Sequence, residues 1–210
     1  MEWNALSAQN LAIIDQEVED HSLSPAAYEI ARRIVFYTFD FGYLSSLAFS
    51  PASLQTGAAA LAARTTIVVD VPMVKAGILP NVDKYFANPI YCGMETLTRP
   101  QKQKTKTAWG IQTLARRYPE AIFIIGEDLS ALKVLIDLAE SDQIKPALVI
   151  ATPGGFVGAE LLKNKLKNST LPHIRVDGNK GGAVVAVAIF TALIDLAWQA
   201  YQQDTKVVNN

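Results

Sequence analysis

The sequence predicts one α/β domain over residues 1–210, with a five-stranded parallel sheet flanked by helices in a Rossmann-like, three-layer arrangement. First, short β-branched runs alternate with helical segments, as βαβ crossovers require. Second, runs such as Ile122–Ile125 are apolar on both faces, which is typical of a parallel strand covered on both sides. Third, half of the 210 residues are hydrophobic, enough to bury the core of one domain. The predicted strands are Thr66–Val71, Pro89–Gly93, Ala121–Gly126, Ala147–Ala151 and His173–Val176.

Helical periodicity accounts for most of the remaining chain. Two amphipathic helices form an N-terminal pair, Asn4–Val18 and Ser24–Thr38, and the second begins with the cap-like Ser24-Pro25. A long final helix runs from Gly182 to about Tyr201, and the polar tail over residues 203–210 is expected to be disordered. The helices that separate the strands are Pro51–Arg64, Gln101–Arg117, Ser130–Ser141 and Val157–Lys167.

Charge and hydropathy exclude several classes of protein. A formal net charge of −1 gives no general attraction for nucleic acid or an anionic membrane. The one basic run, Arg99 to Lys106, is more typical of a helix start than of a polyanion site. The longest apolar run, Ala183–Ile194, is too short to span a bilayer, and the N-terminus lacks a signal-peptide pattern. We therefore expect a cytoplasmic protein without nucleic-acid or membrane partners.

Cysteine and histidine are too sparse for several kinds of site. Cys92 is alone, which excludes a disulfide framework and a thiolate metal cage, and its apolar strand predicts burial. His21 and His173 lie 152 positions apart, so neither a local metal pair nor a histidine-based triad can be argued. No P-loop or GxGxxG follows a strand. We expect neither a metal nor a cofactor.

Glycine, carboxylate and lysine residues follow all five predicted strands. Ligands of parallel α/β sheets bind beyond the carboxyl ends of the strands, so these loops together predict one pocket, although ordinary βα turns would explain many of the glycines. The loops are Asp70-Val71-Pro72-Met73-Val74-Lys75, Gly93-Met94-Glu95, Gly126-Glu127-Asp128, Thr152-Pro153-Gly154-Gly155 and Asp177-Gly178-Asn179-Lys180-Gly181-Gly182.

The last of these loops and the acids suggest particular chemistry. Lys180 with the amides of Gly181 and Gly182 could hold a carboxylate or phosphate at the start of the final helix, or form a plain turn. The acids could act in acid–base chemistry or cap helices. Capping is expected for Asp128, whereas Asp70 is the better functional candidate because Pro72 should prevent immediate helix entry.

Four segments resemble motifs of one known family, the precorrin-8X methylmutases or precorrin isomerases. Val69–Gly77 resembles the family's "TDVNMVRAGI", and Gly178–Ala183 resembles its "GRKGGS". Pro146–Gly158 is similar to "PALVIGxPVGFVGA", and Arg32–Phe41 is similar to "RRMIHTTADF". The resemblance covers about residues 5–200 in the family's order and spacing.

The resemblance implies a homodimer with a cleft for a tetrapyrrole, a corrinoid small molecule. In the family, a methyl group moves between adjacent carbons at ring C, which turns precorrin-8X into hydrogenobyrinic acid, or the cobalt form into cobyrinate, without a cofactor. Such a substrate carries many carboxylates and needs Lys, Arg and helix N-termini around it. Rearrangement within one molecule requires positioning and a proton donor rather than a nucleophile.

The chain departs from the family at several motif positions. The family's proton-donating histidine falls on Phe36, which cannot donate a proton, and the neighbouring Tyr37 is turned by about 100° along a helix. An arginine of the family's motifs falls on Lys106, which lacks the planar fork of a guanidinium. Two carboxylates, Glu127 and Asp128, enter a loop where a polyanionic substrate should lie, and Asn179 and Ala183 replace an arginine and a serine.

These residues define the predicted site and three hypotheses. The catalytic candidates are Tyr37, Phe36 and Lys106. The chain is either a methylmutase of cobalamin biosynthesis, a paralogue that binds a tetrapyrrole as carrier or regulator, or an enzyme for a less carboxylated tetrapyrrole. A dimer interface is expected around Trp109 and along Ala192, Trp198 and Tyr201. The predicted substrate-binding residues are Asp70, Met73, Lys75, Glu127, Asp128, Ser130, Gly155, Lys180, Gly181 and Gly182.

Overall fold

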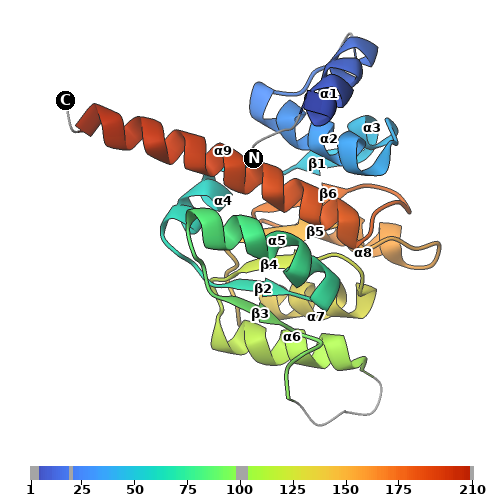
Figure 1. Ribbon diagram of the computed structural model, residues 1–210. Coiled ribbons are helices and arrows are strands. Elements are labelled where there is room, and N and C mark those ends of the chain that lie inside the picture. Colours follow the sequence, from blue (N-terminus) through green and yellow to red (C-terminus); the bar gives the residue numbers. More distant parts are fainter. Residues whose placement is uncertain (1–4, 19–20, 98–103, 209–210) are drawn as a thin grey trace.

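The computed structural model describes residues 5–18, 21–97 and 104–208, which form a mixed α/β fold around a six-stranded sheet (Figure 1). The strand order is β1-β6-β5-β4-β2-β3. Neighbouring strands are parallel except β1, which runs antiparallel to β6. The strands are β1 (Leu47–Phe49), β2 (Ile67–Val69), β3 (Ile90–Cys92), β4 (Ile122–Ile125), β5 (Leu148–Ala151) and β6 (His173–Val176).

Five predicted parallel strands are confirmed, and β1 is an addition at one edge of the sheet. Its three residues are too few to show an alternating pattern, so the sequence predicted no strand there. Leu47 pairs with Val176 and Phe49 with Ile174. The Ser50 hydroxyl accepts a hydrogen bond from the His173 backbone N–H at 2.7 Å, so tertiary contacts define this strand.

Most predicted helices are present, but α5 was not foreseen. The interpretation that Pro72 prevents helix entry is wrong, because Pro72 is the first residue of α5, where a missing N–H costs nothing. A second proline, Pro80, lies inside the same helix. The helices are α1 (Ala5–Glu17), α2 (Pro25–Thr38), α3 (Tyr43–Ser46), α4 (Ser53–Ala62), α5 (Pro72–Tyr85), α6 (Lys106–Arg117), α7 (Leu129–Glu140), α8 (Ala159–Lys167) and α9 (Ala183–Val208).

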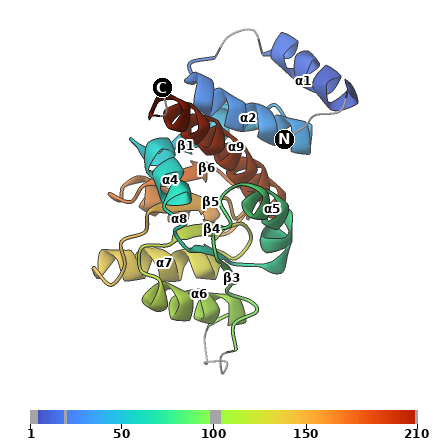
Figure 2. The ribbon, with the colours of Figure 1, turned by 60° about the vertical axis from the view of Figure 1, so that its left-hand side comes forward.

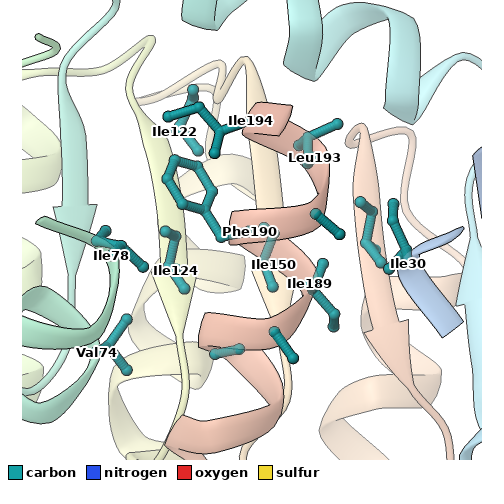
Figure 3. Close-up of a cluster of buried hydrophobic side chains, with 14 of the residues drawn as sticks. Ile30, Val74, Ile78, Ile122, Ile124, Ile150, Ile189, Phe190, Leu193 and Ile194 are labelled. Carbon is teal, nitrogen blue, oxygen red and sulfur yellow. The ribbon is translucent and has the colours of Figure 1, made fainter. Parts of the chain in front are cut away.

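Helices cover both faces of the sheet, because successive strand side chains point to opposite faces. Ile122 and Ile124 pack beneath α2, α4, α5 and α9, and Figure 3 shows Phe190 of α9 pointing toward them. Phe123 and Ile125 pack against α6, α7 and α8 on the other face. Figures 1 and 2 place α6 and α7 at the end of the molecule opposite α1 and α2.

Helix α9 is the central helix of the layer that packs on Ile122 and Ile124. Residues 183–203 have the length and hydropathy of a membrane span, but 67% of the relevant window is buried inside the fold, as expected of a core helix. Ala192 is fully buried, so it is not part of the surface expected for a dimer interface. The helix continues to Val208, seven residues beyond the predicted end at Tyr201. The disorder expected over residues 203–210 stays a prediction, and residues 209–210 lie outside the described chain.

Candidate functional site at the carboxyl edge of the sheet

The loops that follow the parallel strands meet at the carboxyl edge of the sheet and are joined by backbone hydrogen bonds. The Gly182 N–H donates to the Thr152 carbonyl at 2.6 Å, and the Gly155 N–H donates to the Asn179 carbonyl at 2.9 Å. Gly181 has φ +146°, and a Cβ there would lie 1.9 Å from the Thr152 oxygen, so only glycine fits. The Gly182 N–H, which was predicted to bind a ligand anion, therefore donates to the protein's own backbone.

Asp70 is an internal anchor of this edge. Its carboxylate is completely buried, and Oδ2 accepts hydrogen bonds from the N–H groups of Glu127 at 2.7 Å and Asp128 at 2.9 Å. Oδ1 accepts from its neighbour Val71 at 2.9 Å. Burial raises the pKa of Asp70, and the backbone donors oppose that shift. Asp70 was predicted to contact a ligand, and the structure does not show this. Its carboxylate instead joins the end of β2 to the loop after β4 by hydrogen bonds.

Asp128 is the predicted helix cap. Its Oδ1 accepts from the Ala131 N–H at 2.9 Å, which confirms it as the N-cap of α7. Its Oδ2 accepts from the Thr105 hydroxyl at 2.9 Å, and Thr105 in turn caps α6. This bond brings the first turn of α6, with the exposed Lys106, next to the first turn of α7, with the exposed Ser130.

The basic run was expected within a helix from Gln101. Helix α6 begins only at Lys106, and residues 98–103 lie outside the described chain. Lys104 lies 5.4 Å above the ring of Trp109 and donates to the Gln112 side chain at 2.6 Å. The described part of this run therefore packs on its own helix.

Glu127 lies at the N-terminus of α9. Its Oε1 accepts a hydrogen bond from the Ala183 N–H at 2.7 Å, although 56 residues separate the two positions. A carboxylate at a helix N-terminus satisfies an unpaired N–H group and interacts favourably with the helix dipole. The place expected for a ligand anion is thus taken by the protein's own carboxylate.

The two predicted lysines of the edge also face internal carboxylates. Lys180 Nζ lies 2.6 Å from Asp40 Oδ2 and 5.4 Å above the ring of Tyr43. Lys75 Nζ lies 2.6 Å from Glu95 Oε2. The Lys180 ammonium and the Gly42 N–H lower the pKa of Asp40. Both lysines are partly exposed, so these ion pairs are weak and open to exchange with a ligand.

Phe36 and Tyr37 diverge on the last turns of α2. Phe36 is half-buried and packs against the cluster that Leu11 and Ile14 of α1 form with Val35. Tyr37 is 37% exposed, and its ring meets that of Phe36 edge to face at 5.6 Å. A phenol is therefore accessible three residues before Asp40, whereas the position of the family histidine carries a side chain packed against α1.

Exposed apolar side chains also lie in or near the loops after the strands and after α2, and apart from Met73 none of them was a predicted substrate-binding residue. Phe156 is 94% exposed and Val157 87%, although large apolar side chains are usually shielded. In the sequence, the one sign that Phe156 and Val157 would be exposed was their position in the loop after the Gly154-Gly155 pair. Contiguous exposed apolar surface commonly marks a binding site. The other exposed members near the strand ends and the end of α2 are Phe39, Phe41, Met73, Met94, Leu97 and Val184.

Lys163 of α8 supports the glycine loop from beneath and was also missed. It is 1% exposed, and its Nζ donates to the carbonyls of Gly178 at 3.0 Å and Lys180 at 2.8 Å. Burial lowers its pKa to about 8, and the nearby Asp177 opposes that shift. The signal was its spacing, since Ala159, Lys163 and Leu166 share the buried face of α8.

Surface grooves also lie outside these loops. One groove of ≈ 380 Å³ lies between α6 and α7, and its lining includes Lys104, Arg116 and Lys133 together with the predicted Ser130. Another groove lies between the starts of α2 and α4. Cys92 is buried and free, as predicted. Within residues 5–18, 21–97 and 104–208, no group of three or more His, Cys, Asp or Glu side chains could hold a metal ion.

The whole fold has known relatives. The chain is 39% identical over 205 residues to a cobalt-precorrin-8 methylmutase of Synechocystis, covering 91% of this chain and 94% of the relative. It is 33% identical to the cobalt-precorrin-8 methylmutase of Leptospira interrogans, covering 90% and 91% of the two chains. A crystal structure of precorrin-8X methylmutase from Thermus thermophilus superposes with a TM-score of 0.84 at 29% identity, covering 93% and 97%. The precorrin-8X methylmutase family profile matches residues 5–196, and the chain belongs to this family.

Proposed function

We propose that this protein is an isomerase of cobalamin biosynthesis that moves a methyl group at ring C of precorrin-8X, or of its cobalt form. The observation that carries the proposal is the carboxyl edge, where the family motifs bring lysines and exposed apolar side chains together. Lys75 and Lys180 suit the acidic side chains of a tetrapyrrole, and Met73 and Phe156 suit its apolar macrocycle. The two relatives that cover 91% and 90% of this chain carry the name of the same reaction.

The reaction needs little from the protein beyond binding and one proton. The bond from the methyl carbon to one ring carbon breaks as a bond to the adjacent carbon forms, so no atom enters or leaves. A proton on a ring nitrogen favours this shift, and a positioned acid can supply it. Tyr37 is the exposed hydroxyl on the turn where the family places its acid, and Lys75, Lys106 and Lys180 would hold carboxylates. No cofactor is required by this scheme.

The same proposal includes a location in the cytoplasm and assembly as a homodimer. The support for the homodimer is an aromatic cluster at the C-terminal part of α9. There, Trp198 stacks on Tyr201 at 5.8 Å and contacts Tyr85 and Phe86 at the end of α5. Tyr201 is 46% exposed, so part of this apolar surface is available to a second copy. Sedimentation equilibrium tests it, and a stable 22.8 kDa species at micromolar concentration would contradict it.

Absorption titration with hydrogenobyrinic acid, followed by an isomerisation assay with precorrin-8X, tests the function. We expect saturable binding and conversion of the precorrin-8X spectrum into that of the product. The absence of both would overturn the proposal.

A second candidate is a protein that binds a tetrapyrrole without rearranging it. The packing of Phe36 against α1 favours this alternative, because it leaves no imidazole at the family's acid position. Tight binding of hydrogenobyrinic acid with no turnover of precorrin-8X would establish it.

A further inference from the structure

Strand β6, which lies between β1 and β5, carries two buried polar side chains, His173 and Arg175 (Figure 1). Their exposed fractions are only 2% and 5%. They alternate with Ile174 and Val176, which pack in the layer of α9, so they point to the opposite face of the sheet. A buried polar side chain is costly unless the protein supplies its hydrogen-bond partners.

The partners of His173 and Arg175 form one line of hydrogen bonds. Nδ1 of His173 lies 2.8 Å from the Leu171 carbonyl oxygen, and its Nε2 lies 2.8 Å from Nη1 of Arg175. Arg175 Nε donates to Asp177 Oδ1 at 2.7 Å, and Nη2 donates to Oδ2 at 3.3 Å. A carbonyl only accepts and a guanidinium only donates. The His173 ring therefore carries its proton on Nδ1 and is neutral in this arrangement, with Nε2 as the acceptor.

Protonation of this ring would break the line between His173 and Arg175. A charged imidazole has an N–H on both nitrogens, so Nε2 would face a second donor of like charge at 2.8 Å. The His173 backbone is fixed, because its N–H donates to the Ser50 hydroxyl at 2.7 Å and its carbonyl accepts from the Ser50 N–H at 2.9 Å. The Arg175 side chain is therefore the part that must move.

Asp177 connects this line to the glycine loop, residues 178–182, which carries Lys180. Its backbone N–H donates to the Ser46 carbonyl at 2.7 Å, and its carboxylate is held by two nitrogens of Arg175. Asp177 is thus the fixed point from which the loop leaves β6. If Arg175 moves, the Asp177 side chain loses the partner that orients it, three residues before Lys180.

The charges around His173 place its protonation below neutral pH. Among the described residues, Arg175 and Asp177 are the charged groups that act on the ring, and Lys163 of α8 acts on Asp177. The flanking strands β1 and β5 contain no charged residue. Burial lowers the pKa of His173 from its ordinary value of 6.5, the Leu171 carbonyl opposes that shift, and the Arg175 charge adds to it. The ring is therefore neutral at pH 7 and becomes charged only in acid.

We propose that His173 and Arg175 are positioning residues that act through Asp177 to hold the glycine loop, and with it Lys180, in the arrangement that binds an acidic group of the ligand, and that they do so only while His173 is neutral. The inference rests on the proposed tetrapyrrole site and goes beyond it, because it makes binding depend on a buried histidine outside the binding surface. We expect the affinity for a polyacid to fall about fivefold when His173 is charged, the lower end of the usual coupling between two sites.

The first test is an NMR titration of the two histidines of the chain, His21 and His173. The pKa of each ring is measured with and without saturating hydrogenobyrinic acid, and His21→Gln assigns the two signals. Because binding and protonation are linked, a fivefold preference for neutral His173 means that the ligand lowers the pKa of His173 by about 0.7. Simple attraction to a polyanionic ligand would raise that pKa instead. His21, which stacks on Tyr28, should keep its pKa.

The second test compares matched variants by absorption titration with hydrogenobyrinic acid at pH 7 and pH 5. His173→Gln supplies an amide oxygen that can accept from Arg175 and is not protonated in this range. This variant should bind as tightly as the parent protein at pH 7 and lose no affinity through this position at pH 5. The control His21→Gln removes the exposed histidine and should keep the parent's loss of affinity in acid. Thermal unfolding verifies that both variants fold.

The outcomes separate this inference from the proposed function. A His173 pKa that the ligand raises or leaves unchanged would overturn the inference, and so would a folded His173→Gln protein that loses affinity at pH 5 as the parent does. Both results would leave tetrapyrrole binding intact. The NMR titration of the parent protein decides the question if His173→Gln does not fold. Failure of the parent and both variants to bind hydrogenobyrinic acid at pH 7 would overturn the proposed function, and this inference with it.

Discussion

Two carboxylates at the same edge of the sheet, Asp70 and Asp40, have opposite roles. Asp70 is fully buried and accepts from three backbone N–H groups, so it joins two loops as part of the scaffold. Asp40 lies at the surface and pairs with the partly exposed Lys180. Burial therefore decides whether a carboxylate stabilises the fold or remains available for exchange with a ligand.

The largest expected effect comes from Asp70→Ala. The substitution leaves the part-buried N–H groups of Glu127 and Asp128 without their acceptor, which should cost about 2–4 kcal/mol of unfolding free energy. Urea denaturation measures the loss. Asp40→Ala is the control and should lose far less, since its groups are solvated; equal losses in the two variants would break the comparison.

The next effect concerns chemistry on α2, beside Asp40. Phe36→His should raise the isomerisation rate by about 10–100-fold, the range that general-acid catalysis supplies, because imidazole with a pKa near 6.5 donates protons at neutral pH. Single-turnover spectroscopy of precorrin-8X conversion measures it. If the parent protein already reacts quickly and the variant is slower, Tyr37 is the acid, and Tyr37→Phe should then abolish the reaction.

A smaller effect is expected at the exchangeable ion pair itself. Lys180→Ala should weaken binding of hydrogenobyrinic acid by about fivefold at low salt, the order of one charge-assisted hydrogen bond that must first displace Asp40. Lys167→Ala, at the exposed end of α8, removes the same charge away from the edge and should leave the constant unchanged. An equal loss of affinity in both variants would show that binding depends on the net charge of the protein rather than on the position of Lys180.

The smallest expected effect is on the pH dependence of stability and comes from a buried cation, Lys163. The pKa of Lys163 is lowered to about 8 in the folded protein, below its ordinary value of 10.5, so the unfolded chain holds more protons between these two values. The unfolding free energy should therefore rise as the pH increases above about 8. In Lys163→Met this contribution should be absent, as denaturation at pH 7, 8 and 9 would show; an identical pH slope in both proteins would contradict it.

Local sequence pattern alone was sufficient to predict much of this structure. The five parallel strands follow from β-branched runs such as Ile122–Ile125, which can be buried only between two helical layers. The caps of α2 and α7 follow from Ser24 and Asp128, whose side chains bond within three residues. Placing the site at the strand ends is a consequence of parallel topology and needs no tertiary detail.

Local pattern does not show which of those groups meet, because their contacts are long-range. Strand β1 exists through its register with β6, and α5 begins on the proline that was expected to prevent it. The pairing of Lys180 with Asp40 spans 140 residues, and that of Glu127 with Ala183 spans 56. Sequence determined the residue types and the edge of the sheet that carries them, because these depend on local periodicity. Burial and long-range contact then made one carboxylate an anchor, another a helix cap and a third an exchangeable partner, because solvation of a charge depends on the surrounding fold.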